Sequence, residues 1–442
     1  MTTTVHAMPD AQRRKEERRV LAGTMIGTTI EWYDFFIYAQ AAGLVLGPLF
    51  FAPVAEANPG MELVISFATI GVSFLFRPLG AIIVGRLGDK VGRKRMLVWT
   101  LILMGVATAL IGLLPTYEQA GVIAVILLVL LRIAQGFSAG GEWGGAVLMS
   151  VEHAPDHKRG HFGAFPQIGV PAGMILASAV LWFVRTSMSQ EDFMDYGWRI
   201  PFLLSIVLIV VGIFIRRATE ESPVFVEMQE RAKEASAPLG QLFRNHWRDI
   251  IKAALTFSGN NAAGYLVIAF FSSYAVNSLS MDPAGVVLSL TIAAFGWLLF
   301  TMIGGSFSDK IGRVRMHQIG YILLAAAIIP VFLLIDHAGA IGSILLFGAA
   351  LWIMMPGQGL CYGPTSAMYA EMFPANIRYS GVAISYAIGS IVGGAFAPMI
   401  AQALLNATKT TMSIGIYIIV ISLVSFIAVS LIKETKNNDL GV

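Results

Sequence analysis

Cysteine and charge are both scarce in this sequence. One cysteine, Cys361, occurs among 442 residues, so the chain has no disulfide framework and no Cys/His spacing typical of a metal site. Charged residues make up 13% of the chain, against about 25% in soluble proteins. The apolar stretches contain no nucleophile–base set or phosphate-binding glycine loop, which argues against an enzyme. We expect no cofactor and no metal.

Hydrophobic residues are abundant at 56% and occur in long runs. A helix needs about 20 residues to cross the hydrocarbon core of a bilayer. The first run is too long for a signal peptide and is expected to stay as a helix. We therefore predict an all-α integral membrane protein with twelve transmembrane helices. The predicted spans are 20–50, 62–86, 96–114, 120–150, 162–185, 199–216, 251–278, 286–307, 316–336, 340–370, 378–404 and 412–432.

Lys and Arg lie almost entirely in one set of the predicted connections. If the N-terminus is cytoplasmic, 25 of the 30 basic residues fall in cytoplasmic segments and three in the opposite loops, while two lie inside spans. This asymmetry predicts that both termini are cytoplasmic. A bacterial inner membrane fits the pattern. The basic residues follow one membrane face, which argues against nucleic-acid binding.

Two motifs repeat between the halves of the chain. The stretch GRLGDKVGRKR at 85–95 recurs as GSFSDKIGRVR at 305–315, an offset of 220 residues, and the Glu, Pro and Arg after span four recur after span ten at an offset of 219. Parallel six-helix repeats are a transporter architecture with the substrate site between the halves. The predicted segments are a tail 1–19, a bundle 20–216, a loop 217–250, a bundle 251–432 and a tail 433–442.

The repeated loops are also predicted to act as gates. Asp89 and Asp309 each lie at a span end beside basic residues and a helix start, where the helix dipole favours a carboxylate. Breaking such contacts would favour the other facing of the cavity. The alternative is that the basic residues only enforce topology. The predicted gating residues are Gly85, Asp89, Arg93, Glu152, Arg159, Asp309, Arg313, Glu371 and Arg378.

The duplicated loop resembles the signature loop of the major facilitator superfamily, over nearly the whole chain. The stretches EWYDFFIY at 31–38, FRPLG at 76–80, RIAQGFSAGGEWGGA at 132–146 and GWRIPF at 197–202 are similar to the metabolite:proton symporter family. Members of that family carry shikimate, oxoglutarate, citrate, or proline and betaine. The resemblance implies proton symport of a small polar metabolite by alternating access, and it leaves the identity of the substrate open.

Four ionisable side chains lie near the middle of the predicted spans: Glu31, Asp34, Arg77 and Arg132. Each marks a functional site by default, because an unpaired charge in the membrane is costly. Glu31 and Asp34 are three residues apart, on one helix face. Opposite charges at similar depth can neutralise each other, and protonation can change their pairing.

We predict that Asp34 binds the coupled proton and that Arg132 is its partner. In related facilitator-fold symporters an acid on the first helix and an arginine on the fourth have such roles, so the resemblance points the same way. A permanent structural salt bridge is the alternative, and Glu31 competes with Asp34 for the proton. Glu142 is expected either to relay the proton or to brace its helix.

Arginine suits a carboxylate because its planar fork donates two parallel hydrogen bonds, so two midplane arginines favour an anionic substrate. A zwitterion also carries a carboxylate. Pockets combine aromatic walls with a few polar groups, although each such residue taken singly is more often packing. The predicted substrate-binding residues are Tyr33, Tyr38, Arg77, Arg132, Gln167, Asn260, Asn261, Tyr265, Trp297, Gln358, Tyr362 and Tyr386.

Two other functions remain open from the sequence. A proton-driven exporter of drugs or antibiotics would use the same fold and the same buried charges. A zwitterionic osmolyte symporter would use the same site. The expected partners are a small polar or anionic molecule, protons and the lipid bilayer, and we expect a monomer.

Overall fold

The computed structural model describes residues 10–57, 60–91, 93–140, 142–218, 239–374, 377–436, 438 and 440. These residues form helices and turns, and no strand occurs among them. Ten helical units are long and apolar enough to cross a membrane. The shorter apolar segment Val98–Ile111 and the unit that starts with α13 bring the total to twelve. The prediction of an all-α membrane protein with twelve transmembrane helices is confirmed.

The N-terminal half supplies six of these units. Its elements are α1 (Asp10–Ala41), η1 (Ala42–Leu46), α2 (Gly47–Ala57), α3 (Met61–Val91), α4 (Arg93–Ile111), α5 (Tyr117–Ala120), α6 (Val122–Ala139), α7 (Glu142–Glu152), η2 (Asp156–Lys158), α8 (Arg159–Thr186), α9 (Gln190–Asp192), η3 (Phe193–Gly197), α10 (Arg199–Leu203) and α11 (Ser205–Ala218).

The C-terminal half supplies the other six. Its elements are α13 (Leu239–Tyr265), η4 (Leu266–Phe270), α14 (Phe271–Ser273), η5 (Tyr274–Ser278), α15 (Pro283–Ile311), α16 (Arg313–Ile341), α17 (Ile344–Tyr362), α18 (Thr365–Met372), α19 (Arg378–Ser390), η6 (Ile391–Ala395), α20 (Ala397–Thr408) and α21 (Met412–Ser430).

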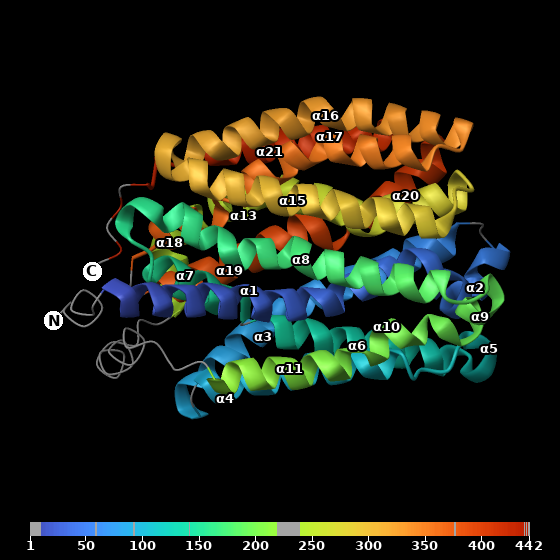
Figure 1. The fold of residues 1–442 in the computed structure, drawn as a ribbon, viewed down its shortest axis with the longest axis horizontal. Helices are drawn as coiled ribbons and strands as arrows, with labels where there is room; N and C mark the ends of the chain where they lie inside the picture. Colours follow the sequence, from blue (N-terminus) through green and yellow to red (C-terminus); the bar gives the residue numbers. More distant parts are fainter. Residues whose placement is uncertain are drawn as a thin grey trace.

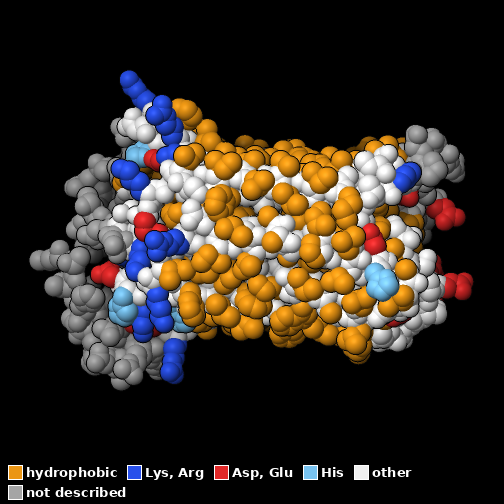
Figure 2. All heavy atoms as spheres, turned by 90° about the horizontal axis from the view of Figure 1, so that it is seen from above, with side chains coloured by type: hydrophobic (Ala, Val, Ile, Leu, Met, Phe, Trp, Pro, Cys, Tyr) orange, Lys and Arg blue, Asp and Glu red, His pale blue; other side chains and the backbone are white. Residues whose placement is uncertain are grey.

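The helices run along the long axis of one bundle, with α8 of the N-terminal half packed against α15 of the C-terminal half (Figure 1). Helix α1 begins at the same end of the bundle as that at which the described C-terminal residues lie (Figure 1). Lys and Arg side chains gather at this end, and a hydrophobic belt covers the middle of the molecule (Figure 2). We call this end the basic end. The belt suits contact with lipid.

Glycine allows α3 and α6 to cross closely in the N-terminal half. A Cβ atom on Gly140 would lie 2.0 Å from the carbonyl oxygen of Arg77. No larger residue fits this position without moving the helices. The crossing brings the two intramembrane arginines, Arg77 on α3 and Arg132 on α6, into neighbouring positions, where each acts electrostatically on the other.

One predicted boundary differs from the structure. The loop predicted over 217–250 is in part helical, because α13 begins at Leu239 and has a kink at His246 (φ −122°, ψ 15°). Phe243 and Trp247 are exposed on this early part, whereas Leu242 and Ile250 are buried. Such an amphipathic segment with aromatic side chains is typical of a membrane surface. Residues 219–238 of the predicted loop lie outside the described residues.

Candidate functional site

A cavity with about 250 Å³ of empty space lies between the halves. The N-terminal half contributes one residue each from α1 and α8, and the C-terminal half contributes the rest of the wall. The lining residues are Trp32, Val170, Phe257, Asn260, Asn261, Gly264, Tyr265, Ile268, Trp297, Gln358, Tyr362 and Tyr386.

All seven residues predicted from the C-terminal half to bind substrate line this cavity. They come from four separate helices, α13, α15, α17 and α19, which the fold brings together. Their role as substrate ligands stays a prediction. Those predicted from the N-terminal half, Tyr33, Tyr38, Arg77, Arg132 and Gln167, are not among the lining residues.

Four of the buried polar atoms in the cavity wall that lack a hydrogen-bond partner among the described residues belong to Trp32, Trp297, Tyr265 and Gln358. Three are donors, Nε1 of Trp32, Nε1 of Trp297 and the hydroxyl of Tyr265, and the fourth is the acceptor Oε1 of Gln358. Leaving a buried polar atom unsatisfied costs about 1–3 kcal/mol. A ligand that accepts more hydrogen bonds than it donates would satisfy this set.

The two adjacent amides of α13 are held by their neighbours. Asn260 donates from Nδ2 to the carbonyl oxygen of Gln358 at 2.8 Å, and Gln358 donates from Nε2 to the carbonyl oxygen of Asn260 at 3.1 Å. Asn261 donates to the carbonyl oxygen of Ser390 at 3.3 Å. These bonds hold α13 against α17 and α19.

Side chains from both halves close the cavity toward the basic end. Trp143 of α7 stacks on Tyr386 of α19, with ring centroids 3.7 Å apart and an interplanar angle of 14°. Gln167 of α8 accepts from Nε1 of Trp143 at 3.1 Å and donates to the carbonyl oxygen of Tyr362 at 3.1 Å. Both ends of the Gln167 amide are therefore occupied, and it ties the halves together outside the cavity.

The halves also meet toward the opposite end. Asn277 of η5 donates from Nδ2 to the carbonyl oxygen of Gly43 in η1 at 3.1 Å. Phe74 of α3 packs edge-on against Tyr265, with centroids 5.2 Å apart. Contacts between the halves on both sides of the cavity describe an occluded arrangement, in which a ligand would be enclosed.

Asp34 lies inside the N-terminal half and is buried. Its Oδ1 accepts a hydrogen bond of 2.6 Å from the hydroxyl of Ser205 on α11, and the hydroxyl of Thr108 on α4 is within hydrogen-bonding reach. No ion pair to Asp34 occurs among the described residues. A buried carboxylate held only by neutral hydroxyl groups in a membrane is costly when ionised, and binding a proton relieves that cost.

The expected direct pair between Arg132 and Asp34 is not formed in this structure. Arg132 donates from Nη1 to Oε1 of Gln135 at 2.6 Å, from Nε to the carbonyl of Thr69 at 3.3 Å and from Nη2 to the carbonyl of Ile70 at 3.4 Å. Its guanidinium also lies 3.7 Å from the ring centroid of Tyr38. Backbone and amide acceptors thus take the positions that the prediction gave to Asp34.

Tyr33 and Tyr38 have partners within the N-terminal half. The hydroxyl of Tyr33 donates to the carbonyl oxygen of Pro201 at 2.7 Å, and the hydroxyl of Tyr38 lies 2.5 Å from that of Thr69. The first bond joins α1 to α10, and the second joins α1 to α3. These positions indicate helix packing for both tyrosines.

Arg77 has donor atoms without hydrogen-bond partners among the described residues, whereas Nε, Nη1 and Nη2 of Arg132 each donate to a protein acceptor. The guanidinium of Arg77 lies over the rings of Phe74 and Phe35, 4.1 and 4.4 Å from their centroids, and its Nε and Nη2 atoms have no hydrogen-bond partner among the described residues. Arg77 and Glu31 both act electrostatically on the cavity residues Tyr265 and Tyr386. This places Arg77 and Glu31 near the cavity edge, whereas Asp34 faces α11.

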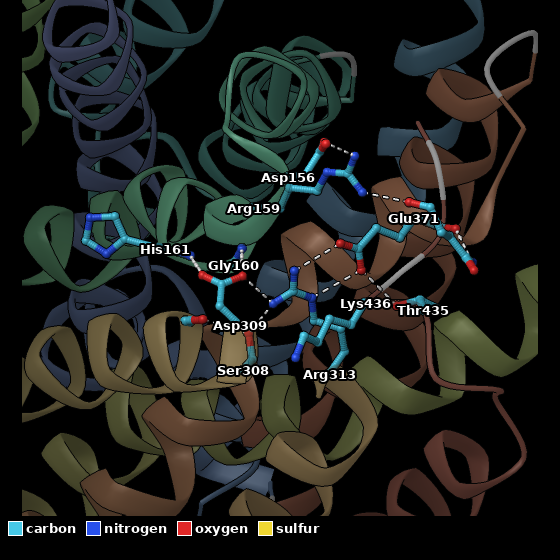
Figure 3. A network of polar contacts seen from close by, with 12 residues as sticks. Asp156, Arg159, Gly160, His161, Ser308, Asp309, Arg313, Glu371, Thr435 and Lys436 are labelled. Carbon is cyan, nitrogen blue, oxygen red and sulfur yellow. Dashed lines mark hydrogen bonds and ion pairs between the residues drawn. The ribbon is translucent and has the colours of Figure 1, made fainter. Parts of the chain in front are cut away.

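Four of the predicted gating residues, Arg159, Asp309, Arg313 and Glu371, belong to a polar network at the basic end (Figure 3). Asp309 at the end of α15 accepts from the backbone N–H of Gly160 and of His161, both at 2.8 Å, at the start of α8. A carboxylate at a helix N-terminus satisfies orphan donors and opposes the helix dipole. The sequence placed this carboxylate beside the following helix, and the structure places it across the interface between the halves.

Arg313 holds Asp309 within the C-terminal half. It donates to Oδ1 of Asp309 at 2.8 Å and to both carboxylate oxygens of Glu371, at 3.0 and 3.1 Å (Figure 3). The bidentate geometry with Glu371 is the stronger kind of charge-assisted contact. Asp309 is therefore oriented toward α8 by a buried, paired arginine.

The C-terminal tail joins this network, which no sequence signal indicated. Glu434 accepts from the backbone N–H of Arg313 at 2.8 Å, and Thr435 donates to Glu371 at 2.9 Å. Arg159 of the N-terminal half donates to the carbonyl oxygen of Asn438 at 2.6 Å. The tail thus contacts both halves.

The remaining predicted gating and proton residues have separate places. Arg378 lies 3.4 Å from Oε1 of Glu152, which links α19 to α7 across the halves. Glu142 is buried at the start of α7, next to Trp143. Gly85, Asp89 and Arg93 fall within 85–97, whose side chains lie outside the described part of the structure.

The family model of the Major Facilitator Superfamily matches residues 24–398. The chain belongs to the major facilitator superfamily. Members of this superfamily are transporters and not enzymes, so this protein is a multi-pass membrane transporter. The expectation that the chain is not an enzyme is confirmed.

Three curated relatives narrow the family. The chain is 36% identical to the shikimate transporter of Escherichia coli, with 95% of each chain covered. It is 35% identical to the inner membrane metabolite transport protein YhjE of Escherichia coli (96% of this chain, 95% of the relative) and 32% identical to the proline/betaine transporter of Salmonella typhimurium (96% and 85%). The predicted resemblance to metabolite, shikimate and proline/betaine transporters is confirmed.

A solved structure of the proton:xylose symporter XylE has the same fold. It aligns with a TM-score of 0.77 at 16% identity and covers 97% of this chain and 98% of its own. At this identity the likeness concerns the fold alone.

Several site residues were missed from the sequence. Trp32 and Val170 provide the N-terminal wall of the cavity, and Trp143 closes it. Trp32 and Trp143 directly follow Glu31 and Glu142, and a charged side chain in an apolar run is the stronger signal of a site. Gln135, Thr108 and Ser205, which surround Asp34 and Arg132, had no signal beyond a polar side chain in an apolar run.

Proposed function

We propose that this transporter is a proton-coupled symporter that imports a small polar metabolite bearing a carboxylate. The observation that carries the proposal is the buried Asp34 carboxyl, which has hydroxyl partners and no cationic partner among the described residues. Such a group can exchange a proton with water when the protein opens to one side of the membrane. Its proton state then differs between the two sides of an energised membrane.

The enclosed cavity is the proposed substrate site. Three unpartnered donors and one acceptor in its wall fit a ligand rich in acceptor oxygens. Arg77, near the cavity edge, has two free donor atoms that suit a carboxylate. Arg132, by contrast, has its donor atoms occupied by protein acceptors and serves to hold α3 and α6.

Transport is proposed to occur by alternating access, with the basic end facing the cytoplasm and both termini on that side. The concentration of Lys and Arg at this end supports the orientation. The Asp309 cap on α8 and the stack of Trp143 on Tyr386 both join the two halves, so they would break when the cavity opens to the cytoplasm. A monomer contains a complete cavity, which supports transport by a single chain.

A zwitterionic osmolyte is the second candidate substrate. The cavity wall contains six aromatic rings, and aromatic faces attract quaternary ammonium groups. A betaine would place its ammonium among these rings and its carboxylate near Arg77. The proline/betaine relative supports this alternative.

One experiment separates these functions. Proteoliposomes containing the full chain are offered labelled shikimate, proline, glycine betaine and xylose, with and without an inward proton gradient. Accumulation of an acid or zwitterion only with the gradient supports the proposal, and the preferred compound identifies the substrate class. Uptake that does not depend on the proton gradient, or export of the label driven by the gradient, contradicts the proposal of proton-coupled import.

A further inference from the structure

A chain of hydrogen bonds connects Arg132 to Asp34 inside the N-terminal half. Arg132 donates to Oε1 of Gln135 at 2.6 Å, and Nε2 of Gln135 donates to the hydroxyl of Thr108 at 2.6 Å. The Thr108 hydroxyl is within hydrogen-bonding reach of Asp34. All four side chains are buried. The arginine and the carboxylate that the sequence paired directly are thus linked through two neutral groups.

The direction of this chain is fixed by chemistry. Arginine has only donors, so Gln135 turns its oxygen toward Arg132 and its amide nitrogen toward Thr108. The Thr108 oxygen therefore accepts from Gln135. Its single hydrogen is left for one of two acceptors, the carbonyl oxygen of Met104 at 3.0 Å or the Asp34 carboxylate. An ionised Asp34 gains from this hydrogen, and a protonated Asp34 leaves it to Met104.

We propose that Gln135 is a positioning residue for proton binding, which holds Thr108 as a hydrogen-bond donor and so stabilises the ionised form of Asp34. The inference rests on the proposed function, in which Asp34 carries the coupled proton. Without Gln135, the Thr108 hydroxyl is free to rotate and the orienting influence of Arg132 is lost. Asp34 then binds its proton more tightly and releases it less readily.

Few other groups compete for this role. Ser205 of α11 also donates to Asp34, at 2.6 Å, but no hydrogen bond links it to Arg132 among the described residues. Tyr33, on the same helix, acts electrostatically on Asp34 and donates its hydroxyl hydrogen to Pro201. Glu31 lies one turn earlier and acts on the cavity tyrosines. Thr108 is therefore the route by which a cationic group reaches Asp34.

The test needs no substrate. The purified full chain in lipid is titrated while infrared spectroscopy follows the C=O stretch of the protonated carboxyl, which is assigned by its loss in Asp34→Asn. Gln135→Leu should move the titration midpoint to higher pH by about one unit, a tenfold increase in proton affinity. Thr108→Val keeps the shape of the side chain and should shift the midpoint in the same direction. This variant therefore provides the same test if Gln135→Leu does not fold.

A double variant tests the link between the two residues. If both act through one chain, Gln135→Leu with Thr108→Val shifts the midpoint little more than either change alone. Ser138→Ala is the matched control, because this α6 hydroxyl donates to the Gln135 backbone carbonyl at 2.9 Å and should leave the midpoint unchanged. Additive shifts, unshifted midpoints or a parent carboxyl that does not titrate would overturn the inference. A shift with no proton-driven uptake of any offered compound would leave it standing and defeat the proposed function.

Discussion

Asp309 of the C-terminal half accepts a 2.8 Å hydrogen bond from the backbone N–H of Gly160, the second residue of α8 in the N-terminal half. Its other oxygen binds the next N–H at the same distance. One carboxylate thus caps a helix of the opposite half, and the cap exists only while the halves are closed at the basic end. Such a contact biases the equilibrium between the two facings of the cavity and does not touch the substrate.

The cap predicts the effect of removing the charge at Asp309. Asp309→Asn loses an acceptor oxygen and the favourable interaction with the helix dipole, each worth about 1 kcal/mol. We expect slower turnover with nearly unchanged substrate affinity, and a larger population open at the basic end. Distances between spin labels on the two halves measure that population. Asp156→Asn is the control, since Asp156 is exposed and its one ion pair among the described residues is with Arg159 of the same half. A large affinity loss in Asp309→Asn would place Asp309 in the binding site.

Close approach of the halves predicts a steric block at Gly160. A Cβ atom there would lie 2.3 Å from the carbonyl oxygen of Gly305, so α8 and α15 cannot meet as they do now. Gly160→Ala should reduce transport at least about tenfold by destabilising the closed basic end, the equivalent of about 1.4 kcal/mol. Gly145→Ala is the control, because its Cβ would meet only Tyr379, at 4.0 Å. Equal transport by both variants would show that this contact is not needed.

The unpartnered hydroxyl of Tyr265 predicts a binding role. Tyr265→Phe should weaken substrate binding about tenfold, as expected for one hydrogen bond to a charged group, with little change in stability. Tyr33→Phe is the matched control, because that hydroxyl bonds Pro201 away from the cavity and its loss should lower stability and spare affinity. Calorimetric binding and thermal unfolding of both variants give the comparison. The reverse pattern would move the substrate away from Tyr265.

The two arginines should respond differently to replacement by lysine, which keeps the charge and loses the fork. Arg77→Lys should weaken binding of an acid while sparing its uncharged amide, since Arg77 has free donors near the cavity. Arg132→Lys should affect both compounds alike, because its donors hold Gln135 and two backbone carbonyls. Competition binding with an acid and its amide measures this difference. If neither variant discriminates between the acid and its amide, then neither Arg77 nor Arg132 binds a substrate carboxylate.

The sequence predicted the fold because hydropathy, the basic loops and the duplicated motifs are local signals. It also predicted residues such as Asn260 and Trp297 at the cavity, since polar and aromatic side chains in an apolar helix need a reason to be there. The partners of those side chains depend on how helices face each other. Periodicity does not encode that choice, so Gln167 was assigned to a cavity although both ends of its amide bind other residues.

The partners of the buried charges could not be predicted for the same reason. Helical rise puts Asp34 and Arg132 at similar depth in the membrane, and depth alone predicts a direct pair. The structure inserts Gln135 and Thr108 between them, because Gly140 lets α6 approach α3 so closely that backbone carbonyls reach Arg132. The contact of Glu434 with the start of α16 was equally invisible, since it joins residues 121 apart through backbone N–H groups.

The Asp34 carboxyl is the group that we propose carries the coupled proton. Asp34→Asn imitates the protonated acid and can neither bind nor release a proton, so coupling should be lost while the cavity is preserved. Glu31→Gln is the internal control, because Glu31 acts on the cavity tyrosines and Asp34 faces Ser205. The control should change affinity more than coupling.

The most direct measurement compares accumulation with exchange in proteoliposomes, using the labelled compound that the parent protein concentrates. For Asp34→Asn we expect exchange of label across the membrane to continue, while accumulation driven by an inward proton gradient falls to the level of equilibration. If Asp34→Asn still concentrates the compound with the pH dependence of the parent, and Glu31→Gln does not, the account of the proton site is contradicted.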